Sequence, residues 1–332
     1  MASRTRQANL VSDVAGKAQL IDANLVNPWG MAAGPSTPLW VADNGADVAT
    51  IYQGGLKKQP ASIVPLVVGI PGGAPTGLVF NPTSGFVVQS GMSSGPALFI
   101  FASEAGNITG WNPGVPPPPF STQARPAVHT AGAIYKGLAI ASAGGQTFLY
   151  ATDFHNGRID VFDSSFTPAT LTGNFTDPSL PAGFAPFGIQ AFGDTLLVTY
   201  AKQDANAEDD VPGLGNGFVD VFDSNGNFVR RLISNGVLNS PCGLAMAPSG
   251  FGAFSHALLV GNFGDGLIHG FNPRTGRFLG TLEGRHGPIQ NDGLWALRFG
   301  NGATGESRTL LFDAGLNDEA DGLLGKIENG NH

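Results

Sequence analysis

Short apolar runs separated by polar turns dominate this sequence, and no stretch keeps the apolar spacing of a helix. A representative unit is FLYATD (148–153), a polar turn, and GRIDVFD (157–163). Both runs alternate between apolar and polar positions or stay apolar for only a few residues, and Gly, Asn or Asp bounds them. Runs of this kind are typical of β-strands joined by tight turns. The pattern predicts an all-β protein.

A signature in which Gly is followed by an apolar residue recurs roughly every 50 residues along the chain. Clear copies are NPWGM (27–31), APTGL (74–78) and SPCGL (240–244). The six anchor positions are Gly30, Gly77, Gly137, Gly188, Gly243 and, in a looser copy, Ala296. A period of this length is expected of the four-stranded blades of a propeller. The repeat therefore predicts a six-bladed β-propeller with strands A to D in each blade.

We interpret the whole chain, residues 1–332, as a single propeller domain. The half-repeat that follows each anchor supplies strands B and C, and the Asp- and Asn-rich turns after it lead to an outer strand D. The blades are expected at roughly residues 24–72, 73–132, 133–184, 185–239, 240–291 and 292–328.

The last repeat ends at residues 325–328, one strand short of a complete blade. Residues 8–14 at the N-terminus belong to no repeat of their own. We expect them to pair with the last blade and close the ring, since closure removes a free sheet edge. The alternative, a disordered N-terminal arm, would leave the strand count incomplete.

Composition and charge exclude several classes of function. The chain has a formal net charge of −8, and its 17 Lys and Arg residues are scattered. Nucleic acids and anionic membrane surfaces both require a concentrated positive patch. The apolar runs are also too short to span a bilayer. We therefore expect no nucleic-acid partner and no membrane insertion.

Cysteine usage and the N-terminus bear on the compartment. The only cysteine, Cys242, excludes an internal disulfide and a multi-cysteine zinc site. The first ten residues, MASRTRQANL, lack the apolar segment of a signal peptide. Either the protein stays inside the cell, or this sequence begins after a cleavage site.

Several motifs carry a resemblance to known proteins. DFHNGRIDVFD (153–163) and PFGI (186–189) are similar to NHL-type propeller repeats. Nearly the whole chain resembles a family of uncharacterised bacterial proteins that often carry a signal peptide and sometimes a PEP-CTERM sorting tail. The motifs that match include NLVNPWG (24–30), TYAKQD (199–204) and LVGNFGD (259–265). The resemblance implies an NHL-like propeller and an exported precursor, hence an extracytoplasmic or secreted protein, but it implies no activity.

The candidate ligand site follows from the propeller geometry. The anchor signature precedes strand A, and the half-repeat turn follows strand B, so both lie on one face around the central channel. The residues before the anchors form one expected ring, namely Trp29, Thr76, Lys136, Phe187, Cys242 and Trp295. A concave surface of aromatic and polar groups is typical of ligand sites. We expect ligand contacts from Trp29, Lys136, Phe187 and Trp295, and only a packing role for Cys242.

A second ring is expected at the ends of the B strands. Its polar members are Asp43, Asp153, Asn262, Asp313 and Tyr200. The three carboxylates and the carboxamide are oxygen ligands of the kind that Ca²⁺ prefers, so they form the candidate metal site. The alternative is structural, because Asp and Asn at strand ends commonly accept hydrogen bonds from nearby backbone N–H groups.

Candidate catalytic residues lie on the same face. His155 stands two residues past Asp153, Tyr200 ends a B strand, and Lys202 follows it in an acidic insertion (202–210). A histidine beside carboxylates can act as a general base. No G-x-S-x-G, P-loop or dinucleotide fingerprint is present to define a chemistry.

Two functions remain open at this stage. The first is an extracytoplasmic propeller that binds a small molecule, peptide or surface polymer at the mouth of its channel. The alternative is a metal-assisted hydrolase or lyase, similar to lactonases, in which a channel-mouth cation polarises a carbonyl or activates water. Fold analogy is the main support for the second. The sequence therefore leaves open whether the protein is an enzyme.

Overall fold

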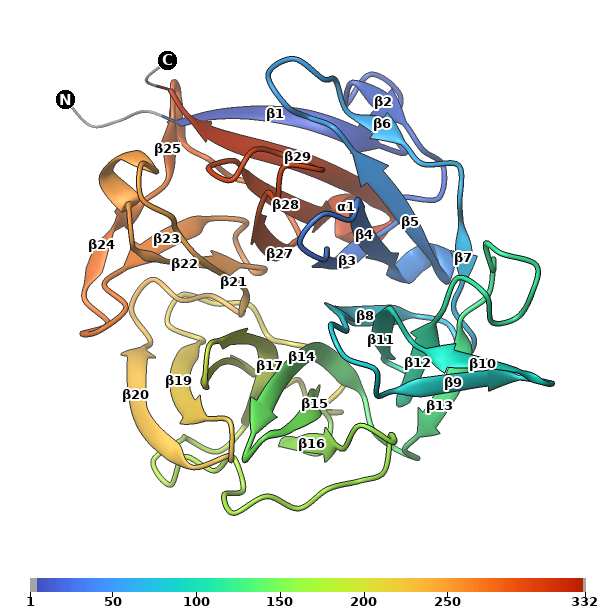
Figure 1. The fold of residues 1–332 in the computed structure, drawn as a ribbon. Coiled ribbons are helices and arrows are strands. Elements are labelled where there is room, and N and C mark those ends of the chain that lie inside the picture. Colours follow the sequence, from blue (N-terminus) through green and yellow to red (C-terminus); the bar gives the residue numbers. More distant parts are fainter. Residues whose placement is uncertain (1–4, 331–332) are drawn as a thin grey trace.

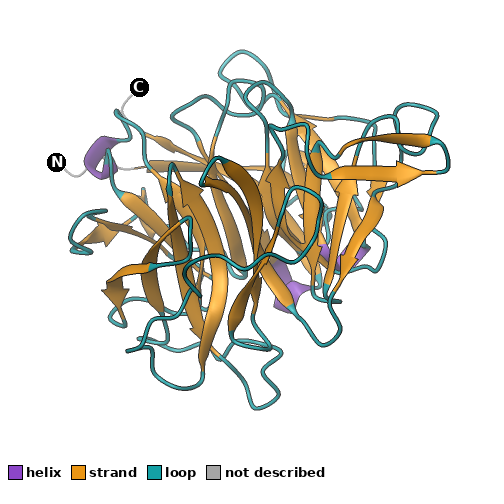
Figure 2. Cartoon of the chain, turned by 60° about the horizontal axis from the view of Figure 1, so that its bottom comes forward, coloured by secondary structure: helices purple, strands orange, loops and turns teal. Residues whose placement is uncertain are grey.

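The computed structural model describes residues 5–330. Six β-sheets stand around a central axis, as Figure 1 shows, and the predicted six-bladed all-β propeller is confirmed. Helical segments among these residues are short, and Figure 2 shows them in the connections between strands. They are η1 (Asn44–Ala46), η2 (Gly252–Phe254) and α1 (Leu316–Glu319).

The first three blades follow the chain in order. Blade 1 consists of β3 (Pro28–Ala32), β4 (Leu39–Asp43), β5 (Val48–Gln53), β6 (Ser62–Ile63) and β7 (Val68–Gly69). Blade 2 consists of β8 (Pro75–Phe80), β11 (Phe99–Ser103), β12 (Asn107–Trp111) and β13 (Arg125–His129). A hairpin of β9 (Val87–Ser90) and β10 (Ser93–Pro96) is inserted in blade 2. Blade 3 consists of β14 (Tyr135–Ala143), β15 (Gln146–Asp153) and β16 (Arg158–Phe162).

The last three blades complete the ring. Blade 4 consists of β17 (Phe184–Phe192), β18 (Thr195–Lys202), β19 (Phe218–Asp223) and β20 (Phe228–Ser234). Blade 5 consists of β21 (Pro241–Met246), β22 (Leu258–Asn262), β23 (Ile268–Phe271) and β24 (Phe278–Thr281). A two-stranded ribbon, β25 (Glu283–Gly284) and β26 (Gly287–Pro288), follows it. Blade 6 consists of β27 (Leu294–Phe299), β28 (Leu310–Gly315), β29 (Asp321–Asn329), β1 (Thr5–Ser12) and β2 (Leu20–Ile21).

The N-terminal strand closes the ring as predicted. β1 pairs antiparallel with β29, from Thr5 opposite Asn329 to Ser12 opposite Leu323. Leu10 and Val11 of β1 are buried, and the Ser12 hydroxyl donates a hydrogen bond to the Gly322 carbonyl at 2.6 Å. Figure 1 shows β1 beside β29 as the outer strand of the last blade.

Blade 3 differs from the expected four strands. Among the described residues, the segment between β16 and β17 forms only an isolated bridge, from Phe162 to Pro168. This segment also contains Pro178 and Pro181. Proline has no backbone N–H to donate to a ladder, so the segment cannot continue as a regular outer strand.

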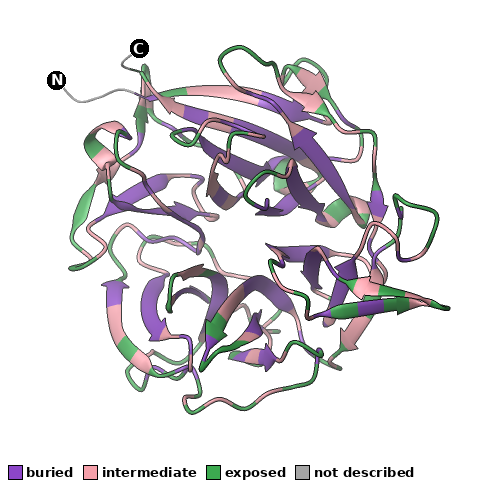
Figure 3. Cartoon of the chain, in the orientation of Figure 1, coloured by how far each residue is buried: buried purple, intermediate pink, exposed green. Residues whose placement is uncertain are grey.

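The apolar core lies between neighbouring blades. Between blades 1 and 2, the rings of Trp40 and Phe99 stack with centroids 4.4 Å apart, and Trp111 lies 4.5 Å from Trp40. Figure 3 shows the buried positions concentrated along the inner strands and the exposed ones in outer loops and turns. Within residues 5–330, no helix is long and apolar enough to cross a membrane.

The anchor glycines are explained by how the innermost strands meet. A β-carbon on Gly30 would lie 2.2 Å from the carbonyl oxygen of Thr76 in the next blade. Only glycine fits at such a distance, because real β-carbons do not approach another backbone so closely. The repeat that predicted the blades is therefore a steric requirement of the propeller axis.

Candidate functional site

Five aromatic side chains fill the channel mouth and form what we call the aromatic plug: Trp29, Phe154, Phe187, Phe263 and Trp295. Trp29 and Trp295 stack with ring centroids 3.5 Å apart, and Phe263 stacks on the other side of Trp295 at 4.0 Å. Phe187 lies 5.9 Å from Trp295 and 5.3 Å from Phe154. The structure thus brings the three aromatic residues of the predicted ligand site together. Trp29, Phe187 and Trp295 are at most 4% exposed, however, so they contact one another instead of lining an open surface.

Lys136, the fourth predicted ligand residue, is buried beside the plug. Its Nζ lies 2.6 Å from Glu104 Oε1 and 3.3 Å from Asp209 Oδ1. The ammonium also stands over the Trp29 ring, 5.1 Å from the centroid. Burial alone would lower the pKa of Lys136, but the two carboxylates outweigh it and hold the pKa above its ordinary value. Lys136 is therefore a charged ammonium and not a nucleophile.

The acidic insertion predicted on this face folds over the plug. Asp209 reaches Lys136, and Gln203 donates a hydrogen bond to the Phe154 carbonyl at 2.6 Å. His155 Nδ1 lies 3.2 Å from the Ala207 carbonyl oxygen. His155, a predicted general base, thus contacts the backbone of the insertion. The insertion acts as a cover for the channel mouth.

A small cavity remains on the axis beneath the plug. Its volume is about 70 Å³, and it is lined by residues beside the anchors of all six blades. Pockets that hold small ligands have volumes of roughly 300–1,000 Å³, so this cavity has room only for water. Cys242 lines it, and burial raises the pKa of its thiol well above the usual range. The thiol is therefore protonated and is not a candidate nucleophile.

Three of the four residues of the predicted metal ring form local hydrogen bonds, whereas both carboxyl oxygens of the buried Asp43 have no hydrogen-bond partner among the described residues. Asp153 Oδ1 accepts hydrogen bonds from the backbone N–H of Ile134 and of Asn156, at 3.3 and 3.2 Å. Asp313 Oδ1 accepts one from the N–H of Ala296 at 2.6 Å. The Asn262 amide donates to the Val237 carbonyl at 2.8 Å. These contacts are the turn chemistry that was the alternative interpretation.

The sequence predicted that the oxygens of these strand-end residues converge on the propeller axis. The structure does not show that convergence. Among residues 5–330, no three His, Cys, Asp or Glu side chains lie close enough to share a metal ion. Asp43 and Asp313 are fully buried, and burial raises the pKa of both carboxyl groups well above the ordinary value. Asp43, Asp153 and Asp313 thus form no three-carboxylate cluster in the described part of the chain.

The three predicted catalytic residues do not converge either. Tyr200 is 2% exposed and faces a charged cluster formed by Asp220 and Arg231 of blade 4 and by Asp177 of the segment between β16 and β17. Burial, and then the charge of Asp220, raises the pKa of the Tyr200 hydroxyl well above its usual value. Lys202 is exposed, and His155 contacts Ala207. The structure shows no shared reaction centre for these residues in the part of the chain that it describes.

An open pocket lies beside the plug, between blades 5 and 6. Its volume is about 400 Å³, and we call it the mouth pocket. Phe263 of the aromatic plug forms one wall, and four carboxylates together with Pro212 and three glycines line the rest. The lining residues are Pro212, Phe263, Gly264, Asp265, Asp292, Gly293, Gly315, Asp318 and Glu319. Sequence reasoning missed this pocket as a site, although the motif LVGNFGD (259–265) and the acidic segment after Leu316 contribute to it.

The acidic wall of the mouth pocket has an unusual backbone. Asn317, Asp318 and Glu319 have φ angles of 54°, 53° and 66°, in the left-handed region that non-glycine residues rarely adopt. A left-handed backbone conformation costs free energy in a non-glycine residue, and it persists only where surrounding contacts fix it. Here Asn27 donates a hydrogen bond to Glu319 at 2.6 Å and accepts one from the Trp295 indole at 2.9 Å. The wall is therefore held in place by the plug.

Comparison with solved structures defines the class of fold. The chain resembles virginiamycin B lyase from Staphylococcus aureus (TM-score 0.53, 14% identity, 98% of this chain and 99% of that one). It also resembles the soluble aldose sugar dehydrogenase of Escherichia coli (TM-score 0.56, 14% identity, 98% and 99%). A third neighbour is named as a gluconolactonase (TM-score 0.56, 13% identity, 99% and 92%). These three likenesses are of fold alone, and they agree with the six-bladed β-propeller that the strand order shows.

Sequence comparison defines the family. No family model matches the chain. It is 33% identical to the uncharacterized protein R648 of Acanthamoeba polyphaga mimivirus, over 96% of this chain and 78% of that protein. It is 32% identical to the uncharacterized protein L690 of the same virus, over 92% and 81%. The chain belongs to the same family as these two proteins.

Proposed function

We propose that this propeller is a binding protein whose ligand carries positively charged groups and occupies the mouth pocket. The observation that carries the proposal is the combination of an aromatic wall, Phe263, with carboxylates in one open pocket of about 400 Å³. The pocket is of the size that small-molecule sites have. It adjoins the predicted ligand residue Trp295, on which Phe263 stacks.

The chemistry of the lining favours an amine or guanidinium. A cation gains energy over an aromatic face and from nearby carboxylates. Asp292 and Asp318 are exposed and Phe263 is half-buried, so these groups are accessible to a ligand. Suitable ligands are a polyamine, a Lys- or Arg-containing peptide, or a polymer that carries amino groups.

A binding measurement tests this proposal. We expect spermidine to bind saturably in titration calorimetry at low salt, and the Asp292→Asn, Asp318→Asn double variant to bind at least about fivefold more weakly, as loss of charged contacts predicts. Asp194→Asn removes an exposed carboxylate from the turn between β17 and β18, at the other end of the blades, and serves as the matched control. No saturable binding, or an equal loss in the control, would contradict the proposal.

The enzymatic alternative is a metal-assisted hydrolase or lyase. Its support is the fold shared with a lyase and with a protein named as a gluconolactonase. Elemental analysis of the purified protein for Ca, Zn and Cu tests it. A stoichiometric metal would favour this alternative, and its absence together with spermidine binding would favour the binding protein.

The proposal retains the extracytoplasmic location and the kinship with exported bacterial propellers that the sequence resemblance implies. Fractionation of the source cells tests the location. Recovery of the protein in the cytoplasmic fraction alone would contradict it.

A further inference from the structure

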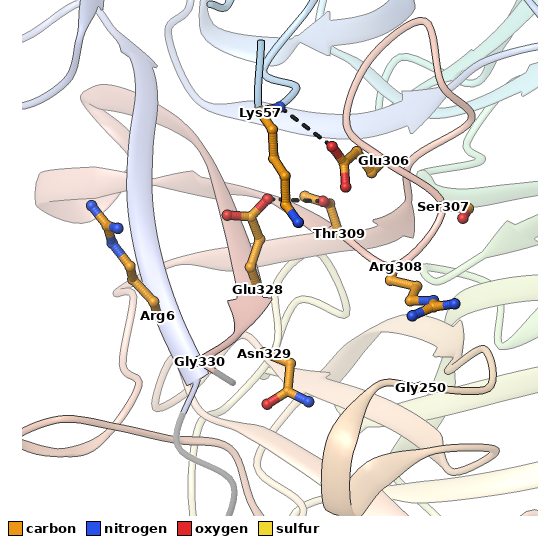
Figure 4. Close-up of a pocket in the computed structure, with 10 residues that line it drawn as sticks. All are labelled: Arg6, Lys57, Gly250, Glu306, Ser307, Arg308, Thr309, Glu328, Asn329 and Gly330. Carbon is orange, nitrogen blue, oxygen red and sulfur yellow. Dashed lines mark hydrogen bonds between the residues drawn. The ribbon is translucent and has the colours of Figure 1, made fainter. Parts of the chain in front are cut away.

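A second open pocket lies at the opposite end of the propeller from the channel mouth. It is lined by the turns between strands A and B of blades 5 and 6, the loop after β5, and the ends of β1 and β29 (Figure 4). Its volume is about 680 Å³, and we call it the rear pocket. The lining residues are Arg6, Lys57, Gly250, Glu306, Ser307, Arg308, Thr309, Glu328, Asn329 and Gly330.

The two carboxylates of the rear pocket are already engaged by the protein. Glu328 Oε1 accepts hydrogen bonds from the Thr309 hydroxyl and from Lys326 Nζ, both at 3.1 Å. Glu306 Oε1 accepts one from the backbone N–H of Lys57 at 3.4 Å. Lys326 thus offsets the charge of Glu328, whereas Glu306 keeps its charge and accepts only from a neutral backbone N–H.

The three positively charged side chains that line the rear pocket have no ion pair comparable to that of Glu328 with Lys326. Arg6, Lys57 and Arg308 are exposed, and no carboxylate within residues 5–330 forms an ion pair with their side chains. In Figure 4, Arg6 and Arg308 stand on opposite sides of the pocket, and Lys57 extends between them. The guanidinium of Arg308 lies against Gly250, where a β-carbon would be 3.2 Å from it. Although the chain has a net charge of −8, positively charged side chains outnumber carboxylates in the lining of this pocket.

We propose that the rear pocket binds an oligoanion, a molecule with at least two phosphate, sulfate or carboxylate groups. Guanidinium groups bind such groups through paired hydrogen bonds, and Arg6 and Arg308 are placed for two of them. Lys57 supplies a point charge between the two, and the exposed Ser307 hydroxyl supplies a further donor. This site is independent of the mouth pocket, since it has the opposite charge and lies at the other end of the blades.

Titration calorimetry with tripolyphosphate tests this proposal, against NaCl at matched ionic strength. We expect saturable binding, weakened at least about fivefold by Arg308→Ala or Lys57→Ala and lost in Arg308→Glu, as for charge-assisted contacts. Arg277→Ala is the matched control, because Arg277 is an exposed arginine between β23 and β24 with no ion pair among the described residues. Parallel titrations with sulfate and citrate identify which anionic group is preferred.

Two results would overturn the proposal. One is a tripolyphosphate signal no larger than that of NaCl, and the other is equal weakening in Arg277→Ala. Spermidine binding, measured on the same Arg308→Ala protein, should be unchanged. Failure at the rear pocket is therefore distinguishable from failure at the mouth pocket.

Discussion

Gly188 faces the backbone carbonyl of Cys242 so closely that a β-carbon on Gly188 would lie 2.2 Å from the carbonyl oxygen. Gly188 begins blade 4 and Cys242 begins blade 5, and Gly243 meets the carbonyl of Trp295 in blade 6 in the same way, at 2.8 Å. Neighbouring blades therefore meet at the axis backbone against backbone. A side chain at Gly188 or Gly243 would push two blades apart.

Gly188→Ala is expected to destabilise the protein by about 1–3 kcal/mol, the usual cost of overpacking a buried site. The contact is with backbone, which cannot move aside as a side chain can. Urea unfolding followed by circular dichroism measures the loss. Gly114→Ala is the control, since its nearest neighbour would be a side-chain oxygen at an ordinary 3.6 Å. Equal stability of the two variants would show that the axis can relax.

This relationship explains how much of the fold could be predicted. A glycine that a neighbouring backbone demands recurs in the first strand of five blades, with Ala296 at the equivalent position of the sixth, so the blade count is visible in the sequence. Blade 3 shows the limit, because its turn at Asp163 predicted an outer strand that the prolines in the following segment prevent.

Removal of residues 1–13 is expected to lower the melting temperature markedly. It would delete β1, bare the edge of β29 and expose the apolar surface that Leu10 and Val11 cover. Differential scanning calorimetry measures the change, with removal of residues 1–4 as the control that leaves β1 intact. An unchanged melting temperature in the longer deletion would contradict closure as a source of stability.

Asp43→Asn is expected to change the pH dependence of stability. Burial raises the pKa of Asp43 in the folded protein, so the unfolded chain releases this proton at lower pH than the folded protein does. Wild-type stability should therefore fall as pH rises above the ordinary value of 3.8, by up to about 1.4 kcal/mol per pH unit for one proton.

The Asp43→Asn variant has no such proton to retain. Above pH 4 the free energy of unfolding of the wild type should therefore fall relative to that of the variant. Below pH 4 the two free energies should depend on pH in the same way. Urea unfolding between pH 3 and pH 9 gives the two curves. Parallel curves over the whole range would contradict the prediction, because they would show that Asp43 has the same pKa in the folded and the unfolded protein.

The candidate site was less predictable than the fold, for a reason visible at Asp153 and Lys136. Position in the repeat sets the strand end at which each lies, since Asp153 pairs with Tyr135, the neighbour of Lys136, in the ladder of β14 and β15. A shift of one residue in the register of a strand turns every side chain to the opposite face, so the sequence does not fix where Asp153 points. The contacts of Lys136 with Glu104 and Asp209 join segments that are distant in the sequence. No pattern in the sequence marks that convergence.

The protein is expected to show no measurable binding to duplex DNA at physiological salt. DNA binding requires many phosphate contacts at once, and the 17 Lys and Arg residues are scattered among 25 Asp and Glu. The rear pocket offers only a few cations, enough for a short oligoanion. A gel-shift titration beside a known DNA-binding protein checks this, and salt-sensitive micromolar binding would contradict it.

The Lys136–Glu104 pair is expected to stabilise the channel mouth more than an exposed pair would. Lys136→Met leaves Glu104 without its cation and removes the charge above Trp29, and loss of one partner of a buried pair typically costs about 3–5 kcal/mol. Glu104 is 28% exposed, so the lower end of that range is expected. Arg277→Met is the control, since Arg277 is exposed and has no ion pair among the described residues, so its loss should change stability by less than about 0.5 kcal/mol.

A double-mutant cycle separates the pair from its surroundings. If the Glu104 carboxylate lowers the free energy of unfolding only when it lacks its cation, adding Glu104→Gln to Lys136→Met should restore part of the stability that Lys136→Met removes. Urea unfolding of the wild type, the two single variants and the double variant gives the coupling free energy. Strict additivity would mean that Lys136 acts through its contacts with Trp29 and Asp209, and that the pair with Glu104 contributes nothing of its own.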